Sequence, residues 1–121
     1  MTLEEFYSKL GGNHDDVLSR LLSEKRIEHF VFRFLDDNSM DTLCTALKDK
    51  NYNQAFHSAH NLKGLAQNLG FIRLASSAGN ISEVLRSENE TIREKAYSLI
   101  GKVTADHNEV RFAIEALQES L

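Results

Sequence analysis

The sequence predicts an all-α protein, and three features support this fold class. The 121 residues contain no proline and only six glycines, so residues that interrupt helices are scarce. Apolar residues recur at steps of three and four along most of the chain, which is typical of helices with one buried face. No segment shows the strict alternation of apolar and polar residues that a half-buried strand would require.

The length predicts one domain over residues 1–121, which is large enough to bury a core without disulfides or metals. We divide it into a helical lead-in over residues 1–23 and a bundle over residues 24–120. Because the predicted connections are short, consecutive helices should be antiparallel neighbours. The expected architecture is an up-and-down antiparallel four-helix bundle, with one or two short N-terminal helices.

The first half of the chain contains the predicted lead-in and the first bundle helix. Thr2 can cap a helix that reaches about Leu10, Asn13 can cap a second short helix, and Ser23 can cap a third. The third helix carries an apolar stripe of Ile27, Phe30, Val31, Phe34 and Leu35. Residues 37–39 are either a break or a kink, where Ser39 can cap a new helix containing Met40, Leu43, Cys44 and Leu47.

The second half supplies the remaining bundle helices. One helix should begin at Asn51 or Asn53 and end at Gly70, with a buried face of Tyr52, Ala55, Ala59, Leu62, Ala66 and Leu69. In the next helix we expect the inward residues to be Leu74, Ala78, Ile81 and Leu85. A final long helix over residues 91–120 has a predicted seam of Ile92, Ala96, Leu99, Val103, Val110, Ile114 and Leu117.

The composition argues against several classes of protein. The net charge of −4 is opposite to that of most nucleic-acid-binding domains. One cysteine, Cys44, can form neither an internal disulfide nor a cysteine-based zinc cluster. There is no apolar run of about 18 residues and no basic-then-apolar leader at the start, so we expect a cytoplasmic protein without a membrane segment.

One stripe on the helix before Gly70 is unusual, because its residues are not those that fill a core. His60, Lys63, Gly64 and Gln67 fall at i, i+3, i+4 and i+7, about 100° away from the apolar face of the same helix. This phase places His60 at the edge of the core or in solvent. The neutral imidazole of a histidine is a nucleophile.

The neighbours of His60 suggest what it would attack. Lys63 can balance the negative charge that a phosphoryl group would bring to His60. Gly64 costs about 1 kcal/mol relative to alanine inside a helix, which makes sense if another molecule must approach closely. Gln67 would add a polar side wall. The chain has no Walker-type loop and no kinase residue set, so its phosphoryl group must come from elsewhere.

A metal site is the alternative for this face, since His57 and His60 stand three residues apart. No third ligand of suitable type shares the face, and Lys63 would repel a cation, so we predict no metal. His14 and His29 have no supporting context, and His107 is expected to be a partly buried structural histidine near the seam of the last helix.

The stretch AHNLKGLAQNLGF resembles the signature of histidine-containing phosphotransfer (HPt) domains, which is His-x-x-Lys-Gly, five residues and Gly. The matching residues are His60, Lys63, Gly64 and Gly70, and the resemblance covers about residues 24–120. The N-terminal segment is similar to that of small free-standing bacterial members. The resemblance implies that His60 accepts a phosphoryl group from a receiver-domain aspartate, that Lys63 stabilises the phosphohistidine, and that Gly64 leaves room for the receiver.

The resemblance also implies the partners of this chemistry. The receiver domain of a response regulator or a hybrid histidine kinase would bring Mg²⁺, whereas this chain would bind no cofactor and act as a phosphotransfer intermediate rather than a self-contained enzyme. Separately, no large apolar stripe is left over to require dimerisation, so we expect a monomer. Leu65, off the core face, is a candidate for docking the receiver. Family members often carry Gln or Glu where this chain has Ser82, with Glu83 beside it. The Ser82 hydroxyl or a water would then orient His60, and Arg86 would add positive charge.

Three functions from different classes therefore follow from the sequence. The first is a phosphorelay carrier in two-component signalling, active through His60. The second is a receiver-binding module that transfers no phosphate, which the serine at position 82 keeps open. The third is a helical scaffold that contains the motif by chance.

Overall fold

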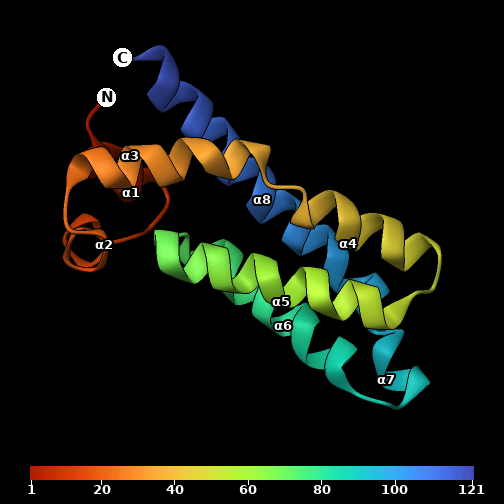
Figure 1. The fold of residues 1–121 in the computed structure, drawn as a ribbon. Helices are drawn as coiled ribbons and strands as arrows, with labels where there is room; N and C mark the ends of the chain where they lie inside the picture. Colours follow the sequence, from red (N-terminus) through yellow and green to blue (C-terminus); the bar gives the residue numbers. More distant parts are fainter.

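The computed structural model describes residues 1–121 and contains helices and connecting turns but no strand, which confirms the all-α prediction (Figure 1). No helix is both long and apolar enough to cross a membrane. The elements in chain order are α1 (Leu3–Lys9), α2 (His14–Leu21), α3 (Glu24–Arg33), the 3₁₀ turn η1 (Phe34–Asp36), α4 (Ser39–Lys48), α5 (Tyr52–Leu69), α6 (Ile72–Arg86), α7 (Glu90–Arg93) and α8 (Ala96–Glu119).

Helices α1, α2, α3 and α5 begin at residues whose side-chain oxygens cap them. Thr2 and Glu5 form a reciprocal capping box at α1, with the Glu5 amide donating to Thr2 Oγ1 at 3.1 Å. The side chains of Asn13, Ser23 and Asn51 accept from the first turns of α2, α3 and α5. Each of these bonds satisfies an amide that has no partner within its helix, so the predicted starts of these helices are confirmed.

The segment between α3 and α4 is a true break rather than a kink. Asp37 has an extended backbone, with φ −72° and ψ 135°, and Asn38 occupies the N-cap position of α4. The Asp37 carboxylate accepts from the Ser39 amide at 3.0 Å. The expectation that Ser39 caps α4 is therefore wrong, because Asp37 binds the first amide and Ser39 lies within the helix.

The last predicted helix is divided in two. The amides of Lys95, Tyr97 and Ser98 bond three residues back instead of four, as in Tyr97 N to Glu94 O at 3.2 Å, and this separates α7 from α8. Ile92 is 38% exposed, so its place in the buried seam is wrong. The remaining seam residues are buried or half-buried in α8. The buried Asp106 fills the turn between Val103 and Val110.

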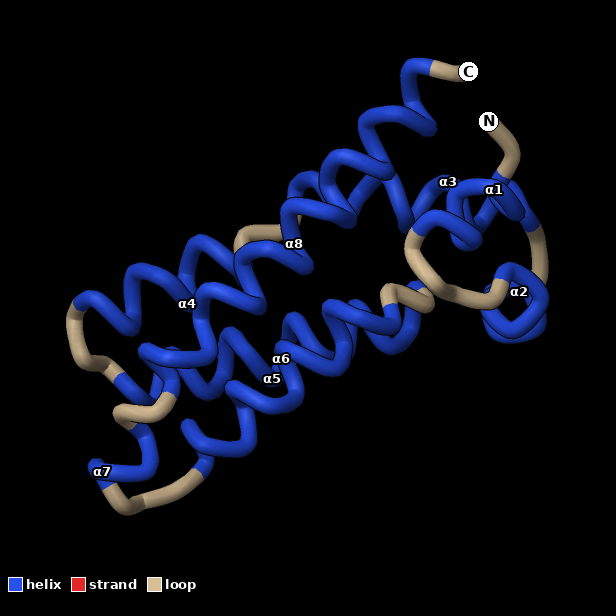
Figure 2. The backbone as a smooth tube through the Cα atoms, turned by 180° about the vertical axis from the view of Figure 1, so that it is seen from behind, coloured by secondary structure: helices blue, strands red, loops and turns tan.

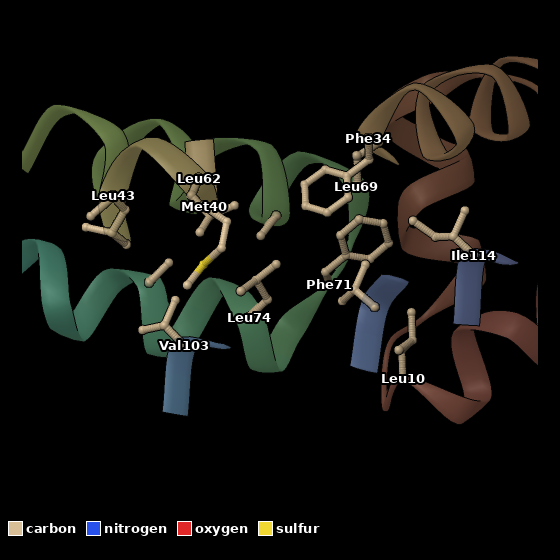
Figure 3. Close-up of a cluster of buried hydrophobic side chains, with 14 of the residues drawn as sticks. Leu10, Phe34, Met40, Leu43, Leu62, Leu69, Phe71, Leu74, Val103 and Ile114 are labelled. Carbon is tan, nitrogen blue, oxygen red and sulfur yellow. The ribbon is translucent and has the colours of Figure 1, made fainter. Parts of the chain in front are cut away.

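The longer helices pack around one core (Figures 1 and 2). Helices α5 and α6 run side by side and antiparallel, α4 packs on α5, and α8 packs against α6 and α4. Helices α1, α2 and α3 close the end of the bundle at which the two termini lie. Leu10, Phe34, Phe71 and Ile114 fill this end, whereas Leu43, Leu62 and Val103 lie further along (Figure 3). These residues belong to a single buried cluster.

The C-terminal end of α5 is fixed by the N-terminal helices. The Tyr7 hydroxyl donates to the Leu69 carbonyl at 2.7 Å. Gly70 ends the helix with φ +77°, and a Cβ there would lie 2.4 Å from Val17 Cγ2, so this position requires glycine. The residues predicted for the core face of α5 are all buried, which fixes the direction of its opposite face.

Candidate functional site

The outer face of α5 carries the residues that the sequence singles out. His60, Gly64 and Gln67 are exposed, and Lys63 is half-buried. On the opposite side, Ala59, Leu62 and Ala66 are buried. The predicted separation of the helix into a packing face and a polar face is therefore present.

The imidazole of His60 lies on an aromatic ring. Phe56, one turn earlier on α5, stacks with it at a centroid distance of 5.7 Å and an interplanar angle of 25°. Phe56 is itself half-buried and packed against the core cluster. The sequence analysis missed Phe56, although an aromatic four residues before the histidine is a visible signal for such a contact.

Lys63 extends from α5 towards α6. Its Cδ and Cε atoms lie 3.6 Å from the position that a Cβ on Gly79 would occupy. The stem of the lysine therefore crosses the α5–α6 interface over a position without a side chain.

Gly64 has open space above it. A Cβ at this position would meet no atom within 4 Å. Packing within the chain therefore gives no reason for glycine at position 64, where alanine would favour the helix.

Ser82 lies on α6 at the level of His60. Helices α5 and α6 are antiparallel, and Lys63 on α5 faces Gly79 on α6. His60 lies three residues before Lys63 and Ser82 three residues after Gly79, so the two residues are at the same height along the helix pair. Ser82 is buried at 5% exposure.

The remaining predicted residues have other contacts or none. Arg86 forms an exposed ion pair with Glu83, Nη2 to Oε2 at 2.8 Å, so part of its charge is already balanced. The side chain of Gln67 is exposed, but its backbone carbonyl accepts from Arg20 Nη2 at 3.2 Å. Arg20 also donates to the Asn68 carbonyl at 3.2 Å, and so caps α5 from α2.

The flank of α5 opposite α6 has a polar anchor and a cleft. Asn61 Nδ2 donates to Ser39 Oγ at 2.6 Å, which ties α5 to the first turn of α4. Leu65 lines a cleft of about 470 Å³ between α5 and α3, together with Phe30 on the opposite wall. Phe30 is 38% exposed, so the cleft offers apolar surface near the polar stripe.

The other histidines do not belong to this stripe and have contacts of their own. His57 is exposed, and its ring is tilted against that of Phe56 at a centroid distance of 5.5 Å. No three His, Cys, Asp or Glu side chains are grouped closely enough to hold a metal ion. His107 is half-buried beside Phe34, as expected, and burial and then the charge of Arg111 lower its pKa.

Comparison with known families identifies this arrangement. The family model described as Hpt domain matches residues 32–120, from the end of α3 to the end of α8. Comparisons with curated proteins and with solved structures found no match. The matched residues include the whole of α5, which carries the stripe, and the whole of α6, which packs beside it.

Proposed function

Because the chain belongs to the Hpt domain family, we propose that His60 accepts a phosphoryl group from a receiver domain and passes it on. Hpt domains act in phosphotransfer within two-component signalling and interact with the receiver domains of response regulators. The observation that carries the assignment to His60 is the outer face of α5. Its exposed imidazole stands beside a glycine that has open space above it.

The proposed step is a covalent transfer to the imidazole. A ring nitrogen of neutral His60 attacks the phosphorus of an aspartyl phosphate in line. An N–P bond forms, the P–O bond to the aspartate breaks, and the carboxylate leaves with the electron pair. Transfer to a second receiver, or back to the first, reverses these events. Mg²⁺ is expected on the receiver, so that this chain needs no cofactor of its own.

Lys63 and Gly64 support this step in different ways. The ammonium of Lys63 would balance the charge of the phosphoryl group from the α6 side of His60. The open space above Gly64 would admit the receiver, because any side chain there would project from the same face as the imidazole. Gln67 would provide a polar wall one turn from Lys63, and Arg86 would add charge to the extent that Glu83 leaves it free.

The orientation of His60 has two sources in this proposal. The stack with Phe56 holds the plane of the imidazole. Ser82, level with His60 on α6, would reach the ring with its hydroxyl through a water. A serine is shorter than the Gln or Glu that family members often carry there.

The receiver would dock over the stripe and the cleft beside it. Leu65 connects the two, since it follows Gly64 directly and lines the cleft with Phe30. Apolar side chains at the centre of an interface supply most of its affinity, whereas the exposed polar rim supplies little. We further propose that the protein acts as a monomer in the cytoplasm.

A second function remains open, that of a receiver-binding module without transfer. The observation that favours it is the short side chain of Ser82, which is buried on α6 at the level of His60. If transfer required a longer side chain at position 82 to orient the imidazole, the protein would bind receivers but His60 would not be phosphorylated.

One experiment separates these functions. The protein is incubated with a panel of receiver domains carrying a radiolabelled aspartyl phosphate, in parallel with His60→Gln. A carrier acquires an acid-labile, base-stable label that His60→Gln lacks. Tight binding of a receiver without label supports the binding module, and label that persists in His60→Gln overturns the site.

A further inference from the structure

Gly79 lies in the interior of α6, where glycine weakens a helix relative to alanine. Its backbone has an ordinary helical conformation and does not require glycine, since the glycines with positive φ are Gly11 and Gly70. The backbone therefore does not account for glycine at position 79, whose lack of a side chain leaves space on the surface of α6.

That space is used by one side chain. The three atoms nearest to a Cβ placed on Gly79 all belong to Lys63: Cδ and Cε at 3.6 Å and Cγ at 4.0 Å. Apart from the adjoining residues and backbone of α6 itself, no other atom comes closer to the same point than these three. Gly79 is thus not a glycine that lets two helix backbones meet.

The contact restrains a side chain that would otherwise be mobile. A lysine has four rotatable bonds, and holding its ammonium in one place costs conformational entropy. When three of its carbons already lie on the surface of α6, part of this cost is met before a phosphoryl group arrives. The stem also fixes the side from which the ammonium approaches, which is the side of Ser82 rather than that of the cleft.

We propose that Gly79 is a positioning residue that holds the stem of Lys63 on α6 and so directs its ammonium to a phosphoryl group on His60. This inference rests on the proposed function, because it presupposes that Lys63 interacts with the phosphohistidine. In this proposal α6, together with α5, determines where the positive charge of Lys63 lies. Alanine should be tolerated at position 79, since 3.6 Å is an ordinary contact distance.

The test is a double-mutant cycle between positions 79 and 63. The variants are Gly79→Leu, Lys63→Ala and the combination, with Gly101→Leu as the matched control, because a Cβ on Gly101 in α8 meets nothing within 4 Å. His60 is phosphorylated with phosphoramidate, and the half-life of the phosphohistidine is measured without a receiver. If Gly79→Leu proves poorly folded by circular dichroism, Gly79→Gln takes its place.

We expect Lys63→Ala to shorten the half-life by about two- to fivefold, as for a partly exposed charge pair. Gly79→Leu should reproduce most of this change, Gly101→Leu should leave the half-life unaltered, and the combination should be no worse than Lys63→Ala alone. Two results would overturn the inference and leave the role of Lys63 intact. In the first, the effects of Gly79→Leu and Lys63→Ala on the half-life are additive. In the second, Gly79→Leu and Gly101→Leu have the same half-life. An unchanged half-life in Lys63→Ala overturns both the role of Lys63 and the inference. Loss of labelling in the wild type would be a failure of the proposed function itself.

Discussion

The imidazole of His60 lies against the ring of Phe56, with their centroids 5.7 Å apart and their planes 25° from parallel. The two residues are one helical turn apart on α5, and Phe56 is held in turn by the core. A reactive side chain on an exposed helix face would otherwise sample several rotamers. The stack limits them without occupying either ring nitrogen, so one nitrogen stays free to attack.

Replacing Phe56 should therefore slow the chemistry more than it weakens the fold. We expect Phe56→Leu to reduce the rate of transfer at saturating receiver about threefold to tenfold, for a loss of stability of about 1 kcal/mol. Phe56→Tyr keeps the ring and should retain most of the rate. Single-turnover transfer from a phosphorylated receiver measures the rate, and urea denaturation measures the stability.

The control for Phe56 is Phe112, which is 66% exposed on α8. Phe112→Leu should alter neither quantity. A full transfer rate in Phe56→Leu would show that the stack does not orient His60.

Gly64 can be tested against a second glycine with the same surroundings. Gly64 and Gly101 are both helical, and a Cβ at either position would meet nothing within 4 Å. Glutamine at either site should raise the free energy of unfolding by about 0.5 kcal/mol, because glutamine favours helices. Only Gly64→Gln should slow transfer from the receiver, since its side chain would project beside His60.

Thermal unfolding and single-turnover transfer are measured for both glutamine variants. Phosphoramidate, a small donor, should phosphorylate Gly64→Gln nearly as fast as wild type, because the obstacle is to the receiver rather than to the imidazole. Equal transfer rates from the receiver in the two variants would remove the argument for clearance.

The sequence is sufficient to predict the features of α5 that depend on local pattern. Its apolar residues recur at helical spacing and fix the buried face, and the position of His60 follows from the same phase. Asn51 and Gly70 mark its ends by local chemistry, through a capping amide and a left-handed backbone.

Features that depend on contacts between elements escaped the sequence analysis. The place of Lys63 over Gly79 requires the register between α5 and α6, which spacing within either helix does not give. At residues 37–39 the sequence left a break and a kink open, and the bond from the Ser39 amide to the Asp37 carboxylate accompanies the break. Ile92 continues the periodic seam in sequence, yet the tightened turn before α8 leaves it exposed.

His14 links the first turn of α2 to that of α3 and should make stability depend on pH. Its side chain is 9% exposed, with Nδ1 3.1 Å from Asp15 Oδ1 and Nε2 3.0 Å from Glu24 Oε1. Burial alone would lower the pKa of His14, but the hydrogen bonds to the two carboxylates, together with the charges of Glu24 and Glu4, outweigh it and raise the pKa. Only the protonated ring can donate to both carboxylates at once.

A raised pKa in the folded state means that this contribution is complete below the unfolded value of about 6.5 and is lost as pH rises through the folded value. We expect the free energy of unfolding of the wild type, relative to His14→Gln, to fall as the pH is raised above about 6.5. Urea denaturation across this range measures the difference. His107 has a lowered pKa and contributes in the opposite sense, so His107→Gln should change the slope with the opposite sign.

The cleft beside the stripe should determine affinity for the receiver rather than the rate of chemistry. Phe30 and Leu65 face it from α3 and α5, and neither contacts the imidazole of His60 in the way that Phe56 does. Truncating an apolar anchor in an interface typically weakens binding by about 1–2 kcal/mol, which is roughly five- to thirtyfold. We therefore expect Phe30→Ala and Leu65→Ala to raise the KM for the phosphorylated receiver and to leave the rate at saturation nearly unchanged. Leu121→Ala, at an exposed terminal position, is the control, and transfer rates measured over a range of receiver concentrations separate the two parameters. A fall in the saturated rate without a change in KM would place these two side chains in the chemistry and the docking surface elsewhere.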